Sequence, residues 1–207
     1  MESRRDEFLV EMYRQMFNDI NRHIMVIWQS IGLLIGAFAI FALVAQKVIS
    51  PDIATSIIVL LVCWYFAHLI ESSYWYNRNL VIIANIERQF LVKEDLRDIQ
   101  YYFGKHRANK MIKHLQIQVT LGWGLLLIVL IYHFSTRVWP GLNLPMGDFQ
   151  ILRALPYFCI LLSAIYICYL IHDRNKAYTA FLNKSPGKTV DITGVDYNGA
   201  GHAVKDS

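Results

Sequence analysis

Residues 53–70 read IATSIIVLLVCWYFAHLI, a run that contains no Asp, Glu, Lys or Arg and a single histidine, His68. About 20 helical residues are needed to cross a hydrocarbon core about 30 Å thick, so this run is long enough to span a membrane. Three more runs of similar length also lack Asp, Glu, Lys and Arg, at residues 24–46, 115–134 and 154–171. We therefore predict an all-α, polytopic membrane protein with four transmembrane helices.

The composition of the chain supports this prediction. Of its 207 residues, 55% are apolar and 17% are charged, whereas a soluble domain has about 25% charged residues. The mean hydropathy is +0.32. A helix that is apolar on all sides lies either in a large soluble core or in lipid. A chain of 207 residues is too short to enclose four such helices, which excludes a single soluble globule.

The positions of Lys and Arg predict the orientation of these helices, because basic residues are enriched in cytoplasmic loops. Of the 20 basic residues, all but Lys47, Arg137 and Arg153 lie in the N-terminal segment, in the connector between the second and third runs, or in the tail. We therefore expect a multi-pass protein with both termini in the cytosol. The net charge of +4 is then an orientation signal, and direct nucleic-acid binding is not expected.

These features divide the chain into five segments. Residues 1–23 show apolar positions at helical spacing and predict a cytosolic amphipathic helix, expected to pack on the cytosolic connector rather than to lie on the membrane surface. Residues 24–72 and 114–172 are each predicted to form a hairpin of two transmembrane helices. Residues 73–113 are predicted to form a helical cytosolic connector, and residues 173–207 a partly disordered cytosolic tail.

Local signals predict where several helices begin, end or bend. Ser50 is a suitable N-cap for the second transmembrane helix, and Pro51 suits its first position. No helix breaker follows the second span, so we expect this helix to continue to about residue 93. A second cytosolic helix is expected at residues 94–112, and Pro156 is expected to kink the fourth transmembrane helix.

Gly32 and Gly36, followed by Ala37 and Ala39, give the first transmembrane helix a strip of small residues. Such a strip permits the close approach of another helix. It predicts either the seam of a homo-oligomer or packing against the second transmembrane helix of the same chain. Gln29 lies one turn or less before the strip, where it could form a hydrogen bond across the seam.

His68 and Glu71 are three residues apart and share one helix face near the cytosolic end of the second transmembrane helix. Ionisable groups in a membrane are functional candidates, so this pair could line the inner mouth of a pore, relay protons or form half of a metal site. The alternative is interfacial anchoring, since Glu71 lies at the cytosolic boundary. His23, His133 and His172 also lie at span ends and are interpreted as interface anchors.

A dense group of aromatic, amide and arginine residues follows the second transmembrane helix. It predicts either an aromatic belt at the membrane interface, with Arg78 extended to the lipid headgroups, or a specific packed interface for partner docking. We call these residues the collar: Tyr74, Trp75, Asn77, Arg78, Asn79, Asn85 and Arg88.

The chain contains no recognisable catalytic motif. The sequence Gly187-Lys188-Thr189 resembles the end of a phosphate-binding loop. Such a loop needs another glycine five residues before Gly187, and this chain has Leu182 there. Neither Gly-x-Ser-x-Gly nor His-Glu-x-x-His occurs in the sequence. We therefore expect no enzymatic activity, no catalytic residues, no metal and no cofactor.

Residues 5–93 resemble the SLATT group of small bacterial membrane effectors. The shared features are an N-terminal amphipathic helix, a tight hairpin of two spans and a long helix that emerges from the second span. The stretches YWYNRN at residues 74–79 and NIER at residues 85–88 also resemble segments of uncharacterised bacterial membrane proteins. The resemblance implies a bacterial inner (plasma) membrane protein that forms pores or perturbs the membrane in a conflict or phage-defence system, or an accessory of one. The two-span pattern of the group does not include residues 115–134 and 154–171.

We therefore expect a homo-oligomer in the lipid bilayer that acts as a pore-forming or membrane-perturbing effector, with cytosolic helices that receive a signal from a soluble partner protein. The first alternative is a non-conducting membrane anchor that recruits a soluble complex through residues 73–113. The second is a small transporter, although the spans lack the midplane charges and matched helix breaks that transporters use.

Overall fold

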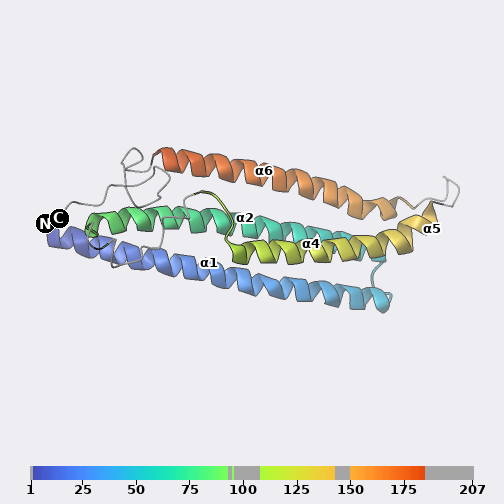
Figure 1. The fold of residues 1–207 in the computed structure, drawn as a ribbon. Helices are drawn as coiled ribbons and strands as arrows, with labels where there is room; N and C mark the ends of the chain where they lie inside the picture. The colour runs from blue at the N-terminus through green and yellow to red at the C-terminus, as the bar shows by residue number, and fades with distance from the viewer. Residues whose placement is uncertain (1, 93–94, 96–107, 143–149, 185–207) are drawn as a thin grey trace. The chain divides into compact units, whose positions relative to one another are not determined.

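The structure is a computed structural model that describes residues 2–92, 95, 108–142 and 150–184, apart from the side chains of residues 2–3, 26–27, 29–31 and 33–34. Every element of the described part is helical, which confirms the predicted all-α class (Figure 1). In chain order these elements are α1 (Glu2–Ala45), α2 (Pro51–Phe90), α4 (Lys113–His133), the π-helical turn η1 (Phe134–Val138), α5 (Trp139–Gly141), the 3-10 turn η3 (Ile151–Ala154) and α6 (Leu155–Asn183).

Three stretches of the described chain are helical, long and apolar enough to cross a membrane: Pro51–Phe90, Lys113–Gly141 and Ile151–Asn183. They contain the second, third and fourth predicted spans, in agreement with a membrane protein. The first predicted span lies within α1, where the described residues give a shorter apolar stretch, Ile35–Ala45. A fourth span and the arrangement in two hairpins therefore stay predictions.

Helix α1 ends in a left-handed turn at Lys47, whose φ is 60°. The backbone N–H of Lys47 donates to the carbonyl of Val44 at 2.9 Å, and that of Val48 donates to the carbonyl of Leu43 at 3.0 Å. These two hydrogen bonds form a Schellman motif, which satisfies carbonyl groups at the end of the helix.

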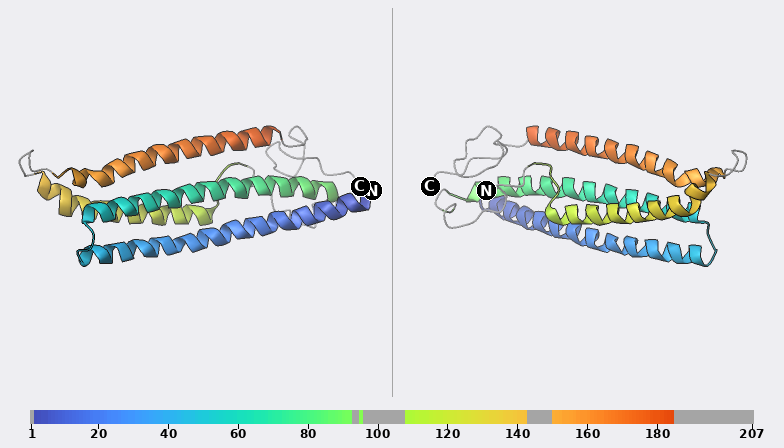
Figure 2. Two further views of the ribbon diagram at one scale, coloured as in Figure 1. Left: turned by 180° about the vertical axis from the view of Figure 1, so that it is seen from behind. Right: turned by 45° about the vertical axis from the view of Figure 1, so that its right-hand side comes forward.

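Helix α2 begins as the sequence predicts. The backbone N–H of Ile53 donates to Ser50 Oγ at 3.2 Å, and Pro51 is the first residue of the helix. The helix continues without interruption to Phe90, and both views of Figure 2 show it as one continuous ribbon. The prediction of a helix that extends well beyond the second span is confirmed.

The chain separates into two compact units. Unit 1 contains Met1–Val26, Glu71–Met111 and Asp173–Ser207, and unit 2 contains Ile27–Ile70 and Ile112–His172. Unit 1 thus collects the segments that the sequence predicts to be cytosolic, and unit 2 collects the predicted spans, with boundaries that agree to within about three residues.

The core of unit 1 forms between the first half of α1 and the second half of α2. Ile20 of α1 is buried against Leu80, Ile83 and Ala84 of α2. Further apolar side chains of both helices cover this cluster: Tyr13, Met16, Phe17, Ile24 and Tyr76. The apolar face of this segment therefore packs on α2 from Tyr13 onward, in agreement with the preferred interpretation, whereas Phe8 near its start is exposed.

Helix α2 lies at the centre of unit 2. The most apolar part of α2 is 56% buried, compared with 28% for the stretch that includes α4 and 11% for the stretch that includes α6. A close approach between α2 and α4 occurs at Gly122, where an added Cβ would lie 2.5 Å from Cε1 of Phe66. Most of the apolar surface of α6 is left for lipid or for another protein.

Two predicted helix features differ from the structure. Pro156 is the second residue of α6 and follows the turn η3, so it lies in a first turn that tolerates proline and not inside the helix, where a kink would require it. Residues 108–112 are not helical, so the predicted helix at 94–112 is wrong at its C-terminal end. Residues 96–107 and 185–207 lie outside the described residues.

Candidate functional site

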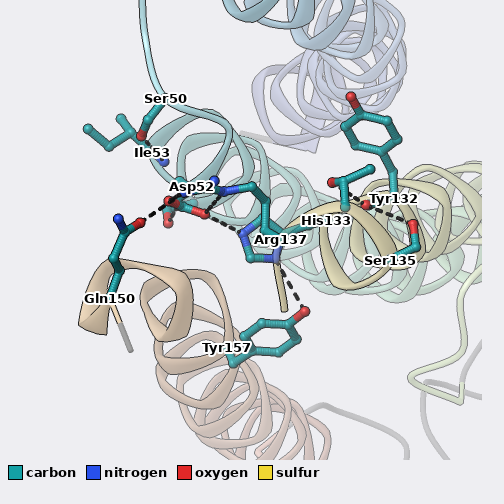
Figure 3. A network of polar contacts seen from close by, with 11 residues as sticks. Ser50, Asp52, Ile53, Tyr132, His133, Ser135, Arg137, Gln150 and Tyr157 are labelled. Carbon is teal, nitrogen blue, oxygen red and sulfur yellow. Dashed lines mark hydrogen bonds and ion pairs between the residues drawn. The ribbon is translucent and has the colours of Figure 1, made fainter. Parts of the chain in front are cut away.

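Asp52 is a buried carboxylate at the start of an apolar helix in unit 2. It lies in the first turn of α2, where the helix dipole favours a negative charge, and it is 2% exposed. A buried charge is stable only when it is paired or hydrogen-bonded. Two side chains at the end of α4 and in the turn that follows it provide these partners (Figure 3).

Arg137 binds the Asp52 carboxylate through two hydrogen bonds. Its Nε donates to Oδ1 at 3.1 Å and its Nη2 donates to Oδ2 at 2.8 Å, the bidentate geometry of a strong arginine–carboxylate pair. Nη2 also donates to Oε1 of Gln150 at 3.3 Å. Arg137 lies in η1, and π-helical turns of this kind are rare and frequent at functional sites.

His133, the last residue of α4, connects Asp52 to α6. Its Nε2 lies 2.9 Å from Asp52 Oδ1, and its Nδ1 lies 3.3 Å from the hydroxyl of Tyr157. A carboxylate only accepts hydrogen bonds, so we assign a proton to Nε2; in the neutral imidazole Nδ1 accepts from the Tyr157 hydroxyl. The imidazole is fully buried, and the interpretation of His133 as an interface anchor is therefore wrong.

These residues form one continuous network, Tyr157 to His133 to Asp52, with Arg137 on the second carboxylate oxygen. It joins the start of α2, the end of α4 with η1, and the first turn of α6 (Figure 3). Two chemical roles suit this arrangement: transfer of a proton along the hydrogen bonds, and a latch that holds three helices together. Removal of one partner from a buried ion pair costs about 3–5 kcal/mol, because it leaves the other charge buried and unpaired.

An apolar cavity of about 210 Å³ lies elsewhere in unit 2, among α2, α4 and α6. Its accessible lining is apolar and includes Val59, Phe66, Trp123, Leu126, Ile160 and Ile167. The same three helices that the network joins thus line an apolar pocket that is only partly enclosed.

The two glycines of the predicted oligomer seam have open space beside them. An added Cβ at Gly32 or at Gly36 would meet no atom within 4 Å. The side chain of Gln29 lies outside the described residues. The two glycines are therefore not in close contact with the described part of α2, whereas Ala37 of the same strip is 2% exposed, and the homo-oligomer seam stays a prediction.

The two predicted inner-mouth residues have different surroundings. The ring of His68 packs edge-on against Trp64 at 4.5 Å between centroids, in unit 2. Glu71, in unit 1, lies 3.4 Å from Nη1 of Arg174. Within the described part of the chain, no group of three or more His, Cys, Asp or Glu side chains is placed to hold a metal ion.

The collar is largely an internal feature of unit 1. Asn77, Asn79 and Arg88 are buried, and Asn77 Nδ2 donates to Asn109 Oδ1 at 3.2 Å and to the carbonyl of Lys110 at 3.1 Å. Asn85 is partly buried, and its Oδ1 has no hydrogen-bond partner in the described structure. Asn77, Asn79 and Arg88 are thus not presented at the surface to a soluble partner.

The aromatic members of the collar contact other parts of unit 1. Tyr74 lies edge-on to Tyr178 at 6.3 Å, and the Arg174 guanidinium lies 5.1 Å from the Tyr74 ring. Trp75 is stacked on His23 at 6.4 Å. These contacts place Tyr74 of α2 against α6 and Trp75 of α2 against α1.

A second acidic group, the half-buried Glu87, lies on the C-terminal half of α2. The hydroxyl of Tyr13 donates to Oε1 of Glu87 at 3.0 Å. Burial and the nearby Glu87 carboxylate raise the pKa of Tyr13 to about 12. Burial also raises the pKa of Glu87, against the hydrogen bond from Tyr13, which lowers it. This pair fastens α1 to α2 within unit 1.

Sequence reasoning did not predict the network around Asp52. The usable signal was that an acidic residue, Asp52, and a basic residue, Arg137, each lie just outside an apolar run on the same predicted side of the membrane. No protein-family model, curated protein or solved structure matches the chain. The function proposed below therefore depends on the sequence and on the geometry of the site.

Proposed function

We propose that the chain is a four-span protein of a bacterial inner membrane, with cytosolic termini, that oligomerises and opens a pore or perturbs the bilayer, as the SLATT resemblance implies for a defence effector. The structure then corresponds to its closed state. In this proposal the Asp52–Arg137 pair, with His133 and Tyr157, is a latch on the extracytoplasmic side.

The burial of the network supports this proposal. Asp52 and His133 are almost completely buried, and Arg137 is 28% exposed in its side chain. Replacement of a buried ion pair by apolar residues is often neutral or stabilising, so such a pair is not needed merely to hold apolar helices together. Ionisable groups next to membrane spans are functional candidates for the same reason.

The apolar cavity supports a closed state. Hydrophobic constrictions block ion flow because they exclude water. The cavity lies among α2, α4 and α6, and the network joins these same helices near one end. Release of the latch would let the helices separate, so that water could enter between them.

The test is leakage of a dye and of ions from liposomes that contain the purified protein. Asp52→Asn and Arg137→Gln each leave one unpaired group, and we expect each to increase leakage about tenfold or more, since removal of one partner of a buried pair costs several kcal/mol. Because the double variant Asp52→Asn/Arg137→Gln leaves no unpaired charge, we expect it to leak less than Arg137→Gln alone.

The matched control is Arg22→Gln. Arg22 pairs with Asp19 at 2.8 Å on the exposed surface, and such surface pairs contribute little, so leakage should stay at the wild-type value. Equal leakage from the control and from the latch variants would contradict a specific latch. Silence of every variant would contradict the pore and favour the non-conducting membrane anchor.

A further inference from the structure

Arg78 is a cationic side chain held by two aromatic rings in unit 1. Its Cζ lies 4.8 Å from the centroid of the Trp75 ring and 5.4 Å from that of the Phe181 ring. Trp75 and Arg78 belong to α2 and Phe181 belongs to α6. Contact with aromatic faces stabilises a guanidinium and restricts its position.

The residues that the structure describes do not neutralise the charge of Arg78. Among the described residues, no carboxylate lies within ion-pair distance of it, and its recorded contacts are the two rings. Arg174 of the same unit gives the contrast. It also lies over an aromatic ring, that of Tyr74, but it pairs with Glu71 at 3.4 Å and with Asp173 at 2.6 Å. Arg78 therefore retains both its charge and N–H donors for an external anion.

The place of Arg78 along α2 brings its long side chain within reach of the lipid headgroups. It lies eight residues beyond residue 70, the end of the apolar run, or about 12 Å along the helix. Helical side chains lean toward the N-terminus of their helix, here toward the apolar run, and the contact with Trp75 one turn earlier agrees with this direction. The exposed ring of Trp75 is typical of the membrane interface.

We infer that Arg78, held by Trp75 and Phe181, binds the phosphate of an anionic membrane lipid. The planar guanidinium can donate two parallel hydrogen bonds to two phosphate oxygens, a geometry that lysine does not offer. This site is independent of the latch around Asp52, and it requires only that α2 crosses the membrane. In a general positive surface, every basic residue would contribute to lipid binding. Here binding depends on Arg78 alone, because Arg174 is already paired with Glu71 and Asp173.

The experiment is native mass spectrometry of the full chain released from vesicles of phosphatidylcholine and phosphatidylglycerol in equal parts. The measured quantity is the ratio of the two lipids that stay bound. We expect Arg78→Gln to lower the preference for phosphatidylglycerol about fivefold, the size of one basic residue near an anionic surface. Arg174→Gln is the matched control and should keep the wild-type ratio. Arg78→Lys should give an intermediate ratio, because lysine keeps the positive charge and lacks the planar guanidinium that donates two parallel hydrogen bonds.

Three results would overturn the inference. The first is an unchanged lipid ratio in Arg78→Gln. The second is an equal loss in Arg78→Gln and Arg174→Gln, which would indicate a general charge effect. The third is loss of the preference when inorganic phosphate is added in millimolar excess, which would show that the site takes free phosphate rather than a lipid. Circular dichroism of each variant establishes that the helices are intact, and Arg78→Lys keeps the inference testable if Arg78→Gln does not fold.

Discussion

Lys47 adopts a backbone conformation that favours glycine. Its φ of 60° is the one positive φ among the described non-glycine residues, and it lies at the glycine position of a Schellman motif. A Cβ in this conformation costs about 1–2 kcal/mol. Glycine adds entropy to the unfolded chain, which offsets part of this gain. We therefore expect Lys47→Gly to raise the free energy of unfolding by about 0.5–1 kcal/mol. Thermal unfolding in detergent measures the change.

The control for Lys47 is Lys47→Ala, which removes the charge and keeps the Cβ. It should show no gain, because the strain in the left-handed conformation stays. A gain in Lys47→Ala as large as in Lys47→Gly would show that the charge, and not the backbone, limits stability at this turn.

At the scale of a helix, α4 contains two glycines with opposite surroundings. A Cβ at Gly122 would lie 2.5 Å from Phe66 Cε1 and 3.3 Å from Tyr65 Cδ1, whereas a Cβ at Gly124 would meet no atom within 4 Å. Alanine is favoured over glycine in a helix by about 1 kcal/mol. We expect Gly124→Ala to be neutral or stabilising and Gly122→Ala to be destabilising by about 1–3 kcal/mol, because it overpacks the contact with α2.

Thermal unfolding of the two α4 variants in the same detergent gives the comparison, and each serves as the control for the other. Equal stability of Gly122→Ala and Gly124→Ala would contradict the close packing of α4 on α2. It would show that the ring of Phe66 moves aside without cost.

The helices could be predicted from the sequence, because the signals for a helix lie within its own residues and the residues next to it. The apolar run at 53–70 and the cap at Ser50 predict the course and start of α2, and both agree with the structure. The turn η1 was not predictable, since a π-helical turn depends on how its neighbours pack and not on propensity. Pro156 was misplaced because the start of α6 is set by the preceding turn η3, which carries no strong sequence signal.

At the scale of the whole chain, the site was harder to predict than the fold. Asp52 and Arg137 are 85 residues apart in the sequence, and Asp52 and His133 are 81 apart, so their contact depends on which helices pack together. Hydropathy places each residue near a span end and says nothing about pairing. The contact of Arg78 with Trp75, by contrast, follows from a spacing of three on one helix, which the sequence contains.

Assembly of several chains is the last property to test, and the open face of α1 makes the test specific. In the described part of the chain, no atom of another element lies within 4 Å of an added Cβ at Gly32 or Gly36, so Gly32→Leu/Gly36→Leu should leave the single chain folded. If the small-residue strip is the oligomer seam, the added side chains keep the helices of neighbouring copies apart, and we expect association about tenfold weaker, a change of about 1.4 kcal/mol. Cross-linking in nanodiscs measures the oligomer, and Gly124→Leu, at an equally open glycine outside the strip, is the control. An unchanged oligomer in Gly32→Leu/Gly36→Leu would place the seam elsewhere, with the exposed apolar surface of α6 as the next face to test.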